Sequence, residues 1–275
     1  MAASLAVSMT GCNHRDPINK FAMNSIATFR SRLRAGDPLL GTFVKTAGYQ
    51  VVEVLGGAGM DFAVLDAEHA PFGRNELDVC LLAARASGLP SLVRIPNGEP
   101  HTVLDVLDMG ATGILVPHAK SAADVNAAIA AARYRGGVRG FSNSPRAGGY
   151  GRIGMGPLVD TADRELAVVC QVEDREAVDR IDEIAAVEGV DCLFIGRADL
   201  AVSYGTFDIT HPDIDAAVER ICAGCRKSGR RVGVFLGNLA EKKRYLDLGA
   251  TLFVVGSDQS MLKAQAGAIA AEFRK

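Results

Sequence analysis

Two carboxylates follow two consecutive strand-like runs of this sequence. Residues 168–172 are apolar apart from Gln171 and lead directly into Glu173, and the next such run, residues 192–195, is followed by Asp199. A strand that is only buried has no packing reason to end on an amide and an acid. Carboxylates at the ends of neighbouring strands can hold a hard divalent cation such as Mg²⁺ or Mn²⁺ and leave positions open for substrate. Zinc would require more nitrogen or sulfur ligands.

An arginine and a histidine occur at comparable positions. Arg94 lies inside an apolar run, where a guanidinium group needs an anionic partner. His69 follows Asp66 and Glu68 directly after another apolar run. An open divalent ion with an arginine suits a small α-keto acid, since the ion acts as a Lewis acid and the arginine stabilises the enolate charge. An imidazole titrates close to neutral pH, so His69 is a candidate general base.

Each of these residues also has a simpler structural explanation. An acid directly after a strand often caps the next helix, which would account for Glu173. His69, taken singly, fits a hydrogen-bonded core histidine. Lys45 is the only lysine at a predicted strand end and could form a Schiff base with a carbonyl substrate. The metal route is preferred over the lysine route because Lys45 stands alone, whereas the other polar residues form a set.

Eight short apolar runs must position these residues, and they alternate with amphipathic segments that end on glycine. The runs cover residues 39–44, 62–65, 92–95, 113–117, 168–172, 192–195, 231–236 and 251–255. Runs of this kind are typical of parallel strands covered on both faces. Eight strands and their helices in about 235 residues predict an α/β TIM (β/α)₈ barrel, in which all strand C-termini face one mouth. A doubly wound sheet is the alternative, but no GxGxxG motif follows the first run.

Length and composition are consistent with a single large domain. The chain has 275 residues and a formal net charge of −2, so electrostatics gives no argument for a nucleic-acid partner. No stretch approaches the ~20 apolar residues of a membrane span, so no membrane partner is expected. We expect a single barrel domain over residues 29–275. Residues 1–28 are expected to be a leader that is disordered or not translated.

The cysteines indicate a reduced, cytoplasmic protein, because Cys170 and Cys192 lie inside apolar runs as buried thiols do. Cys222 and Cys225 have redox or zinc spacing, but no second Cys/His pair accompanies them, so we expect a helix with two thiols. Residues 135–167 break the alternating pattern and are rich in Gly, Ser and Arg up to residue 151. A connection of this length is either a flexible loop or a lid or subunit contact.

Nine motifs occur in one order from about residue 36 to the C-terminus. They are GAGMDFAVLDAEHAP at 57–71, LVRIP at 92–96, VLDMG at 106–110, GILVP at 113–117, QVE at 171–173, VEGVD at 187–191, FIG at 194–196, ADL at 198–200 and RYLDLGA at 244–250. Together they resemble the HpcH/HpaI aldolase/citrate lyase family of class II, metal-dependent pyruvate aldolases. Hydroxy-oxoheptanedioate aldolase and dehydro-deoxyglucarate aldolase belong to that family.

The resemblance implies roles for individual residues. His69 matches the catalytic base, and Asp108 matches an aspartate that sharpens the basicity of this histidine. Arg94 matches the arginine that binds the substrate and supports the enolate.

The remaining matched positions concern the substrate and the metal. Gln171 and the backbone of Ala198 match substrate-binding positions, Glu173 matches a metal ligand, and Asp199 matches both a metal ligand and a substrate contact. The metal implied is Mg²⁺, Mn²⁺ or Co²⁺.

The resemblance also implies a fold of the phosphoenolpyruvate/pyruvate-binding barrel type and a reaction. That reaction is the reversible cleavage of a 4-hydroxy-2-keto acid to pyruvate and an aldehyde through a metal-stabilised enolate. Oxaloacetate decarboxylation, cleavage of an acyl-CoA, and a non-catalytic keto-acid-binding barrel are the alternatives. A homo-oligomer is implied, a hexamer or trimer of dimers, with residues 258–273 as a helix that packs on a neighbouring subunit. Arg197 departs from the family, which often has proline there, and would either contact an acidic substrate or point to solvent.

Overall fold

The computed structural model describes residues 26–275. Most of the leader expected over residues 1–28 lies outside the described residues, where that expectation stays a prediction. Its last three residues form a short 3-10 helix, η1 (Ile26–Thr28), which leads into α2 (Phe29–Ala35).

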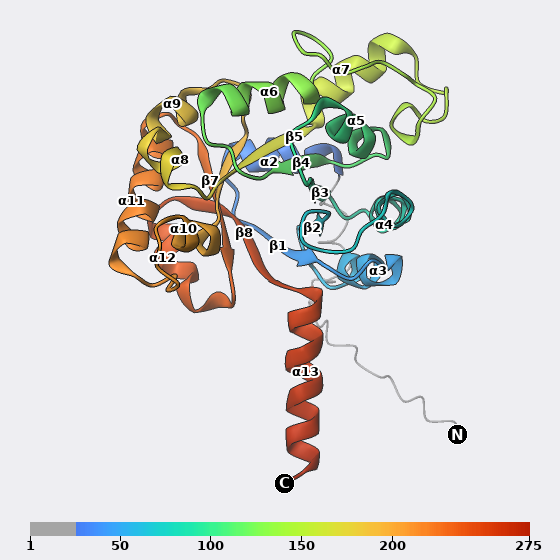
Figure 1. The fold of residues 1–275 in the computed structure, drawn as a ribbon. Helices are drawn as coiled ribbons and strands as arrows, with labels where there is room; N and C mark the ends of the chain where they lie inside the picture. The colour runs from blue at the N-terminus through green and yellow to red at the C-terminus, as the bar shows by residue number, and fades with distance from the viewer. Residues whose placement is uncertain (1–25) are drawn as a thin grey trace, which may run out of the picture.

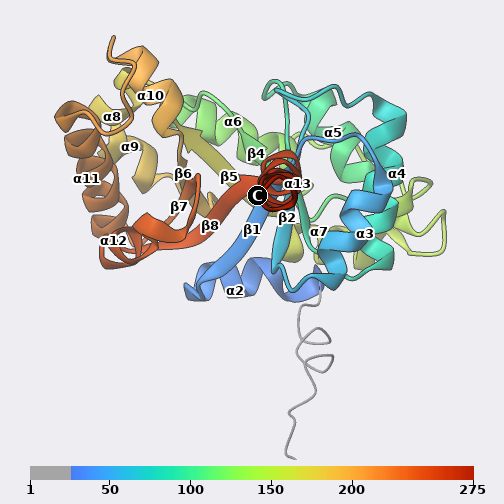
Figure 2. The same ribbon diagram turned by 90° about the horizontal axis from the view of Figure 1, so that it is seen from below.

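Within the described residues, eight parallel strands close into a barrel, with each strand paired to the next and β8 paired to β1 (Figures 1 and 2). The strands are β1 (Leu39–Val44), β2 (Phe62–Asp66), β3 (Ser91–Arg94), β4 (Gly113–Val116), β5 (Ala167–Val172), β6 (Cys192–Ile195), β7 (Arg231–Leu236) and β8 (Ala250–Ser257). All eight predicted runs are strands, and their ends differ from the prediction by two residues at most. The expected TIM barrel is therefore confirmed.

Helices cover the outside of this barrel in the regular βα order (Figure 1). They are α3 (Tyr49–Gly57), α4 (Arg74–Ala86), α5 (Pro100–Asp108), α6 (Ala122–Ala132), α8 (Arg175–Asp179), α9 (Ile181–Ala186), α10 (Arg197–Ser203), α11 (Pro212–Lys227) and α12 (Lys242–Asp247), with the 3-10 turn η3 (Leu239–Glu241) before α12. Local signals explain their ends. Ser121, for example, accepts a hydrogen bond from the backbone N–H of Asp124 and so caps α6.

The hydrophobic core has two parts, one between strands and helices and one inside the barrel. The inner part includes Phe29 and Leu33 of α2, which pack against residues near the strand starts such as Leu39 and Phe62. The rings of Phe29 and Phe62 are 5.5 Å apart. Because α2 closes the amino-terminal end of the barrel, the carboxyl-terminal end remains available for polar side chains.

The long connection before β5 is not a flexible loop. It contains the turn η2 (Arg146–Gly148) and the helix α7 (Met155–Glu165). The buried guanidinium of Arg146 donates to the backbone carbonyl of Met109 and to Asp78, at 2.7 and 2.9 Å. The sequence did not reveal α7 because its first turn contains Gly156 and Pro157, which are typical of turns, and it buries only Leu158.

The CxxC pair lies on α11, as expected, and both thiols are buried. Burial raises the pKa of Cys222 to about 11 and that of Cys225 to about 12. Neither thiol has the electropositive, accessible surroundings of a reactive cysteine. Among residues 26–275 no helix combines the length and the hydrophobicity needed to span a membrane.

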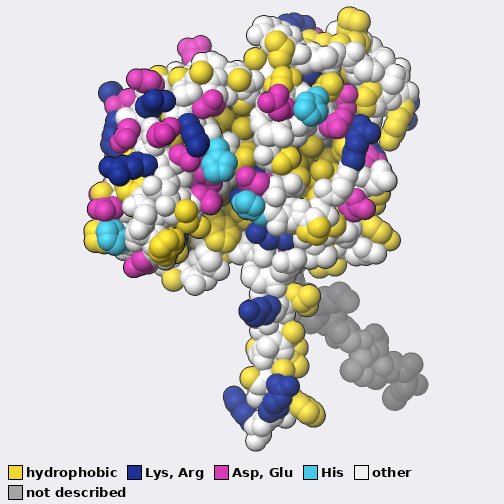
Figure 3. Space-filling model, viewed as in Figure 1, with side chains coloured by type: hydrophobic (Ala, Val, Ile, Leu, Met, Phe, Trp, Pro, Cys, Tyr) yellow, Lys and Arg dark blue, Asp and Glu magenta, His cyan; other side chains and the backbone are white. Residues whose placement is uncertain are grey.

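The last helix, α13 (Asp258–Phe273), extends away from the barrel body and is seen end-on in Figure 2. None of its residues is buried, and its exposed hydrophobic side chains include Leu262, Ile269 and Phe273. The face visible in Figure 3 carries hydrophobic and basic side chains. A helix with this much exposed apolar surface lacks the packing partner that usually stabilises helices in proteins.

Candidate active site

A cavity of about 540 Å³ opens at the carboxyl-terminal end of the barrel. Five residues predicted from the sequence line it: His69, Arg94, Gln171, Ala198 and Asp199. They follow or end the strands β2, β3, β5 and β6, whose carboxyl ends meet at one rim because the strands are parallel. The structure thus brings together residues that are up to 130 positions apart in the chain, since His69 and Asp199 differ by 130 in number.

The guanidinium of Arg94 is held by a fully buried carboxylate. Its Nε and Nη2 atoms donate to Oδ1 and Oδ2 of Asp66 at 2.9 and 2.7 Å. Burial raises the pKa of Asp66, but the hydrogen bonds and charge of Arg94, with smaller contributions from the His69 backbone and Lys45, bring it below its ordinary value. This paired geometry fixes the orientation of the Arg94 side chain at the cavity.

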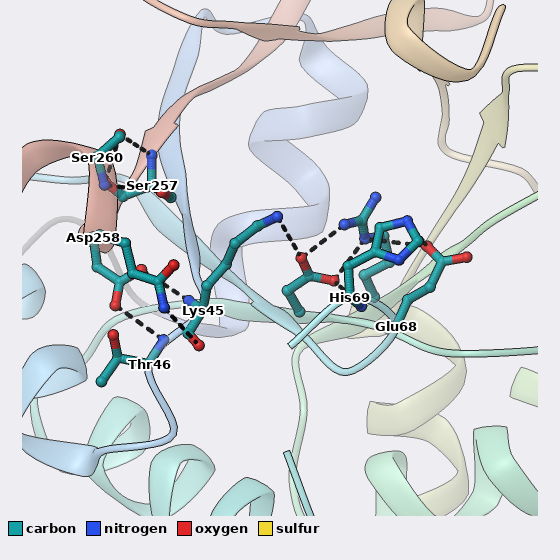
Figure 4. Close-up of polar contacts among 10 residues, drawn as sticks. Lys45, Thr46, Glu68, His69, Ser257, Asp258 and Ser260 are labelled. Atoms are coloured by element: carbon teal, nitrogen blue, oxygen red, sulfur yellow. Dashed lines mark hydrogen bonds and ion pairs between the residues drawn. The ribbon is translucent and has the colours of Figure 1, made fainter. Parts of the chain in front are cut away.

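His69 lies at the cavity with about half of its side chain exposed. Its backbone N–H donates to Asp66 Oδ1 at 3.1 Å, which anchors the loop after β2. Its ring Nε2 lies 3.7 Å from Oε2 of Glu68. Figure 4 shows the imidazole of His69 beside the Glu68 carboxylate. The histidine is therefore not the core histidine of the simpler explanation, since its ring faces the open cavity.

Glu173 is buried directly after β5 and does not cap a helix. Its Oε1 accepts a hydrogen bond from the backbone N–H of His118 at 2.9 Å, and its Oε2 accepts one from the Gln171 amide. Burial raises the pKa of Glu173 to about 7. The backbone N–H and charge of His118 oppose this shift, whereas the charges of Asp199 and Glu68 add to it. The charges of two further carboxylates therefore act on Glu173.

His118 is a residue of this site that the sequence reasoning did not select. Its backbone has a φ of 51°, a left-handed conformation that is uncommon for a residue other than glycine. Its ring Nδ1 lies 3.0 Å from Asp174 and 3.5 Å from Glu173. Strain of this kind often occurs at functional sites. The position directly after a predicted strand was the available signal, but the backbone contact that holds Glu173 cannot be read from the sequence.

Gly196, directly after β6, leaves space for the side chains of Glu173 and Gln171. A Cβ atom at this position would lie 2.6 Å from Glu173 Oε2 and 2.7 Å from Gln171 Nε2. Only glycine leaves this space free. Asp199 follows in the first turn of α10 and faces the same cavity.

The donor set fits a hard divalent cation. Among the residues the structure describes, no three His, Cys, Asp or Glu side chains converge as a complete metal-binding cluster. Glu173 and Asp199 would supply oxygen ligands of the number that Mg²⁺ commonly takes from protein, with water and substrate as further ligands. Burial is the main cause of the raised pKa of Glu173, and the charges of Asp199 and Glu68, which a bound cation would offset, add to it. In addition, Gln171 Oε1 is buried within the described structure and has no hydrogen-bond partner.

Asp108 is not brought to His69 within one chain. It ends α5 on the outside of the barrel, and its Oδ1 accepts from Nη2 of Arg139 at 3.0 Å. Its carboxylate lines a different surface cavity, together with Arg74 and Tyr150. The physical reason is that α5 packs on the outer face of the sheet, so its polar residues turn toward neighbouring helices rather than the barrel interior.

Of the two orientations expected for Arg197, pointing to solvent is wrong, because Arg197 lines the cavity and stays a candidate contact for an acidic substrate. Its side chain is buried, and its two terminal nitrogens form hydrogen bonds of 3.0 and 2.7 Å with the carboxylate of Glu241. The guanidinium also lies 5.2 Å from the ring centre of Tyr245. It lines the cavity but is already paired, so it joins the loop after β6 to the start of α12.

Three comparisons with known proteins agree with this architecture. The family model described as HpcH/HpaI aldolase/citrate lyase matches residues 39–264. A 5-keto-4-deoxy-D-glucarate aldolase from Klebsiella pneumoniae subsp. pneumoniae is 34% identical over 249 residues, which cover 90% of this chain and 96% of that protein. A solved HpcH/HpaI aldolase/citrate lyase family protein from Burkholderia cenocepacia J2315 superposes with a TM-score of 0.86 at 35% identity, covering 90% of this chain and 100% of that one. An HpcH/HpaI aldolase from Desulfitobacterium hafniense DCB-2 gives a TM-score of 0.84 at 26% identity, covering 90% and 96% of the two chains.

Proposed function

The chain belongs to the HpcH/HpaI aldolase/citrate lyase family, and on that premise we propose how its own residues carry out the reaction. The protein is a carbon–carbon lyase of the metal-dependent aldolase class. It cleaves a 4-hydroxy-2-keto acid to pyruvate and an aldehyde, and the reaction is reversible. The observation that carries our assignment of roles is the convergence of His69, Arg94 and Asp199 on one cavity beside the buried Glu173.

In the proposed mechanism Glu173 and Asp199 would hold the divalent ion, which would supply Lewis acidity to the keto acid. Gln171 and the backbone N–H of Ala198 bind the substrate next to that ion. Arg94, fixed by Asp66, donates hydrogen bonds to the C2 oxygen as negative charge develops there. These groups are oriented before the substrate arrives, so little reorganisation opposes the reaction.

His69 moves the proton. It accepts the proton of the C4 hydroxyl, the C3–C4 bond breaks, and its electron pair passes into the C2–C3 double bond of the pyruvate enolate. A carbonyl forms at C4, and the aldehyde leaves. Protonation of C3 then completes the methyl group of pyruvate. In the synthetic direction the same steps run in reverse.

We propose that the natural substrate is a dicarboxylate. A relative with 34% identity is named for 5-keto-4-deoxy-D-glucarate, which is a keto acid with two carboxylates. Mg²⁺ or Mn²⁺ is the preferred ion because the donor set consists of oxygen atoms, and Co²⁺ remains a substitute to test. The five cysteines that the structure describes are free thiols, which supports a reducing, cytoplasmic location.

We also propose that the enzyme is a homo-oligomer, a hexamer built as a trimer of dimers. The exposed hydrophobic side chains of α13 would pack against a neighbouring subunit. Since Asp108 and His69 are apart within one chain, a role of Asp108 in sharpening the basicity of His69 requires the two residues to come from different copies.

Exchange of pyruvate methyl protons in heavy water, followed by NMR, tests the proposed function. We expect exchange with added Mg²⁺, Mn²⁺ or Co²⁺, and none after exhaustive chelation. Release of pyruvate from a 4-hydroxy-2-keto dicarboxylate, coupled to lactate dehydrogenase, tests the cleavage itself. Undiminished exchange in metal-free protein would contradict the metal role, and trapping of pyruvate on Lys45 by borohydride would support the Schiff-base route instead.

A further inference from the structure

We propose that Lys45 is a specificity-determining residue, whose ammonium group binds a carboxylate on the aldehyde portion of the substrate. The inference rests on the aldol reaction proposed above and goes beyond it, because it assigns the distal end of the substrate to a particular side chain. The argument depends on where Lys45 lies, how it is held and what charges surround it.

Lys45 directly follows β1 and lines the same cavity as His69 and Arg94. Its side chain is 31% exposed, and its Nζ lies 3.2 Å from Oδ2 of the buried Asp66. Figure 4 shows the side chain extending toward the group formed by Glu68 and His69. The ammonium group therefore sits at the surface of the cavity rather than in bulk solvent or in the core.

The backbone of Lys45 is tightly held by the start of α13. Its N–H and that of Thr46 donate to the two carboxylate oxygens of Asp258, at 2.8 and 3.0 Å. Its carbonyl accepts a longer hydrogen bond, 3.4 Å, from the Gln259 amide. Figure 4 shows these contacts around Thr46 and Asp258. A binding group supported in this way keeps its position before the ligand arrives.

The barrel places Lys45 across the cavity from the proposed metal ligand Glu173. Strand order is β1 to β8 in sequence around the closed barrel, so β1 lies diametrically opposite β5. The keto acid end of the substrate is bound beside β5 and β6 in the proposed mechanism. In the proposed arrangement the aldehyde portion extends from there toward the β1 side of the cavity, where Phe43 and Phe235 also line it.

The arginines of the cavity are already paired. Arg94 forms two hydrogen bonds with Asp66, and Arg197 forms two with Glu241. Lys45 shares an Asp66 oxygen that lies closer to Arg94, at 2.7 Å against 3.2 Å for Lys45. Among the described residues, Asp66 is the one carboxylate within ion-pair distance of Lys45.

A second lysine adds positive charge to this part of the cavity. Lys263 of α13 lines the same cavity and forms no ion pair with any residue in the described part of the chain. Asp66 and Glu68 balance the charges of Arg94 and Lys45. With a divalent ion offsetting Glu173 and Asp199, the charge of Lys263 therefore leaves the aldehyde side of the cavity positively charged. An anionic group is the ligand that such a surface selects.

Aldol addition of pyruvate to two matched aldehydes tests the inference. Succinic semialdehyde carries the distal carboxylate, and its methyl ester has the same chain without the charge. Product formation is followed by NMR for the wild type and for Lys45→Gln, Lys45→Met and Lys45→Arg. Lys243→Gln, on the exposed surface of α12, is the matched control for loss of one lysine charge.

We expect the wild type to prefer the anionic aldehyde in kcat/KM. This preference should fall roughly 10- to 100-fold in the Gln and Met variants, mainly through KM, because one charge-assisted contact is lost. The Arg variant should keep much of the preference, and Lys243→Gln all of it. Added salt should also weaken the preference in the wild type.

A merely supporting role for Lys45, through Asp66 and Arg94, predicts instead an equal loss for both aldehydes, and that result would overturn the inference. Pyruvate proton exchange separates this outcome from failure of the proposed function. Exchange in the wild type together with an equal loss in the Lys45 variants would refute only the role of Lys45. Absence of exchange in the metal-loaded wild type would refute the proposed function and the inference with it.

Discussion

At the scale of single residues, buried charged side chains organise the site. Asp66 is fully buried beside the nearly buried Arg94, and Glu173 is buried beside two further acids. Arg94 brings the pKa of Asp66 below its usual value despite burial, whereas burial, with a smaller contribution from the charges of Asp199 and Glu68, raises the pKa of Glu173 to about 7. The Asp66–Arg94 pair positions a guanidinium group at the cavity. Among the described residues Glu173 has no such partner, and a bound metal ion would compensate the negative charge around it.

Replacement of Asp66 by asparagine leaves the Arg94 charge buried without its partner. We expect Asp66→Asn to lower the free energy of unfolding by about 3–5 kcal/mol at neutral pH. A carboxyl group with a lowered native pKa stabilises the fold above its unfolded pKa, and this contribution is lost as pH falls through the native value. The difference between wild type and variant in urea unfolding should therefore be complete at pH 7 and narrow below about pH 4.

The exposed pair of Asp182 and Arg220 provides the control for this measurement. Asp182→Asn removes the same charge from the surface and should change stability little. A difference between wild type and Asp66→Asn that stays constant down to pH 3 would show that the Asp66 charge is not the source of the stabilisation.

Removal of either proposed metal ligand should abolish metal binding at the site. Glu173→Gln and Asp199→Asn are each expected to weaken Mn²⁺ binding by roughly 100-fold or more, measured by calorimetry or EPR, because each removes one of two anionic ligands. The rate of pyruvate proton exchange should fall together with the Mn²⁺ affinity. Glu183→Gln, on an exposed face of α9, is the control. Normal Mn²⁺ affinity in both ligand variants would place the metal elsewhere.

At the scale of elements, the site depends on the ends of β5 and β6. Their parallel pairing places Gln171 opposite Phe194 and Val172 opposite Ile195, so the residues that follow both strands emerge side by side. Gly196 then leaves the space that Glu173 and Gln171 occupy. The two acids therefore lie at the same end of the barrel, close enough for the charge of Asp199 to act on Glu173.

A methyl group at position 196 should displace the Glu173 side chain without unfolding the barrel. In Gly196→Ala the new Cβ would lie 2.6 Å from Glu173 Oε2, closer than atoms can approach, so Glu173 must shift. We expect pyruvate proton exchange to fall by roughly 100-fold, since small displacements at a catalytic site have effects of this size. Gly156→Ala, where nothing lies within 4 Å of the new Cβ, is the matched control. Exchange that is equal in the two variants would contradict this account.

At the scale of the whole molecule, two features of the described chain support the proposed oligomer. The helix α13 has no buried residue, and Asp108 lies outside the cavity that contains His69. The first turn of α13 is also bonded to the backbone of Lys45 at the mouth of the cavity. Packing of α13 against another copy would therefore also fix a wall of the active site.

Mixed oligomers test whether the site is shared between copies. His69→Ala and Asp108→Asn should each have low activity alone, but co-expression should restore part of the wild-type activity. Some sites then combine an intact His69 from one copy with an intact Asp108 from another. Co-expression of His69→Ala with Arg94→Ala is the control and should restore nothing, because both residues line the cavity of the same chain. An inactive mixture of the first pair would argue against a shared site.

The local pattern of the sequence determined the strands, the barrel and the predicted ligand positions Glu173 and Asp199. These follow from hydrophobic runs and from the rule that parallel strands expose their carboxyl ends at one rim, and neither depends on distant residues. The tertiary structure alone decided which contacts form between residues that are far apart in the chain. Examples are the His118 backbone that holds Glu173, the Glu241 partner of Arg197, and the separation of Asp108 from His69. Such contacts depend on how loops and helices pack around the barrel, which no short-range pattern encodes.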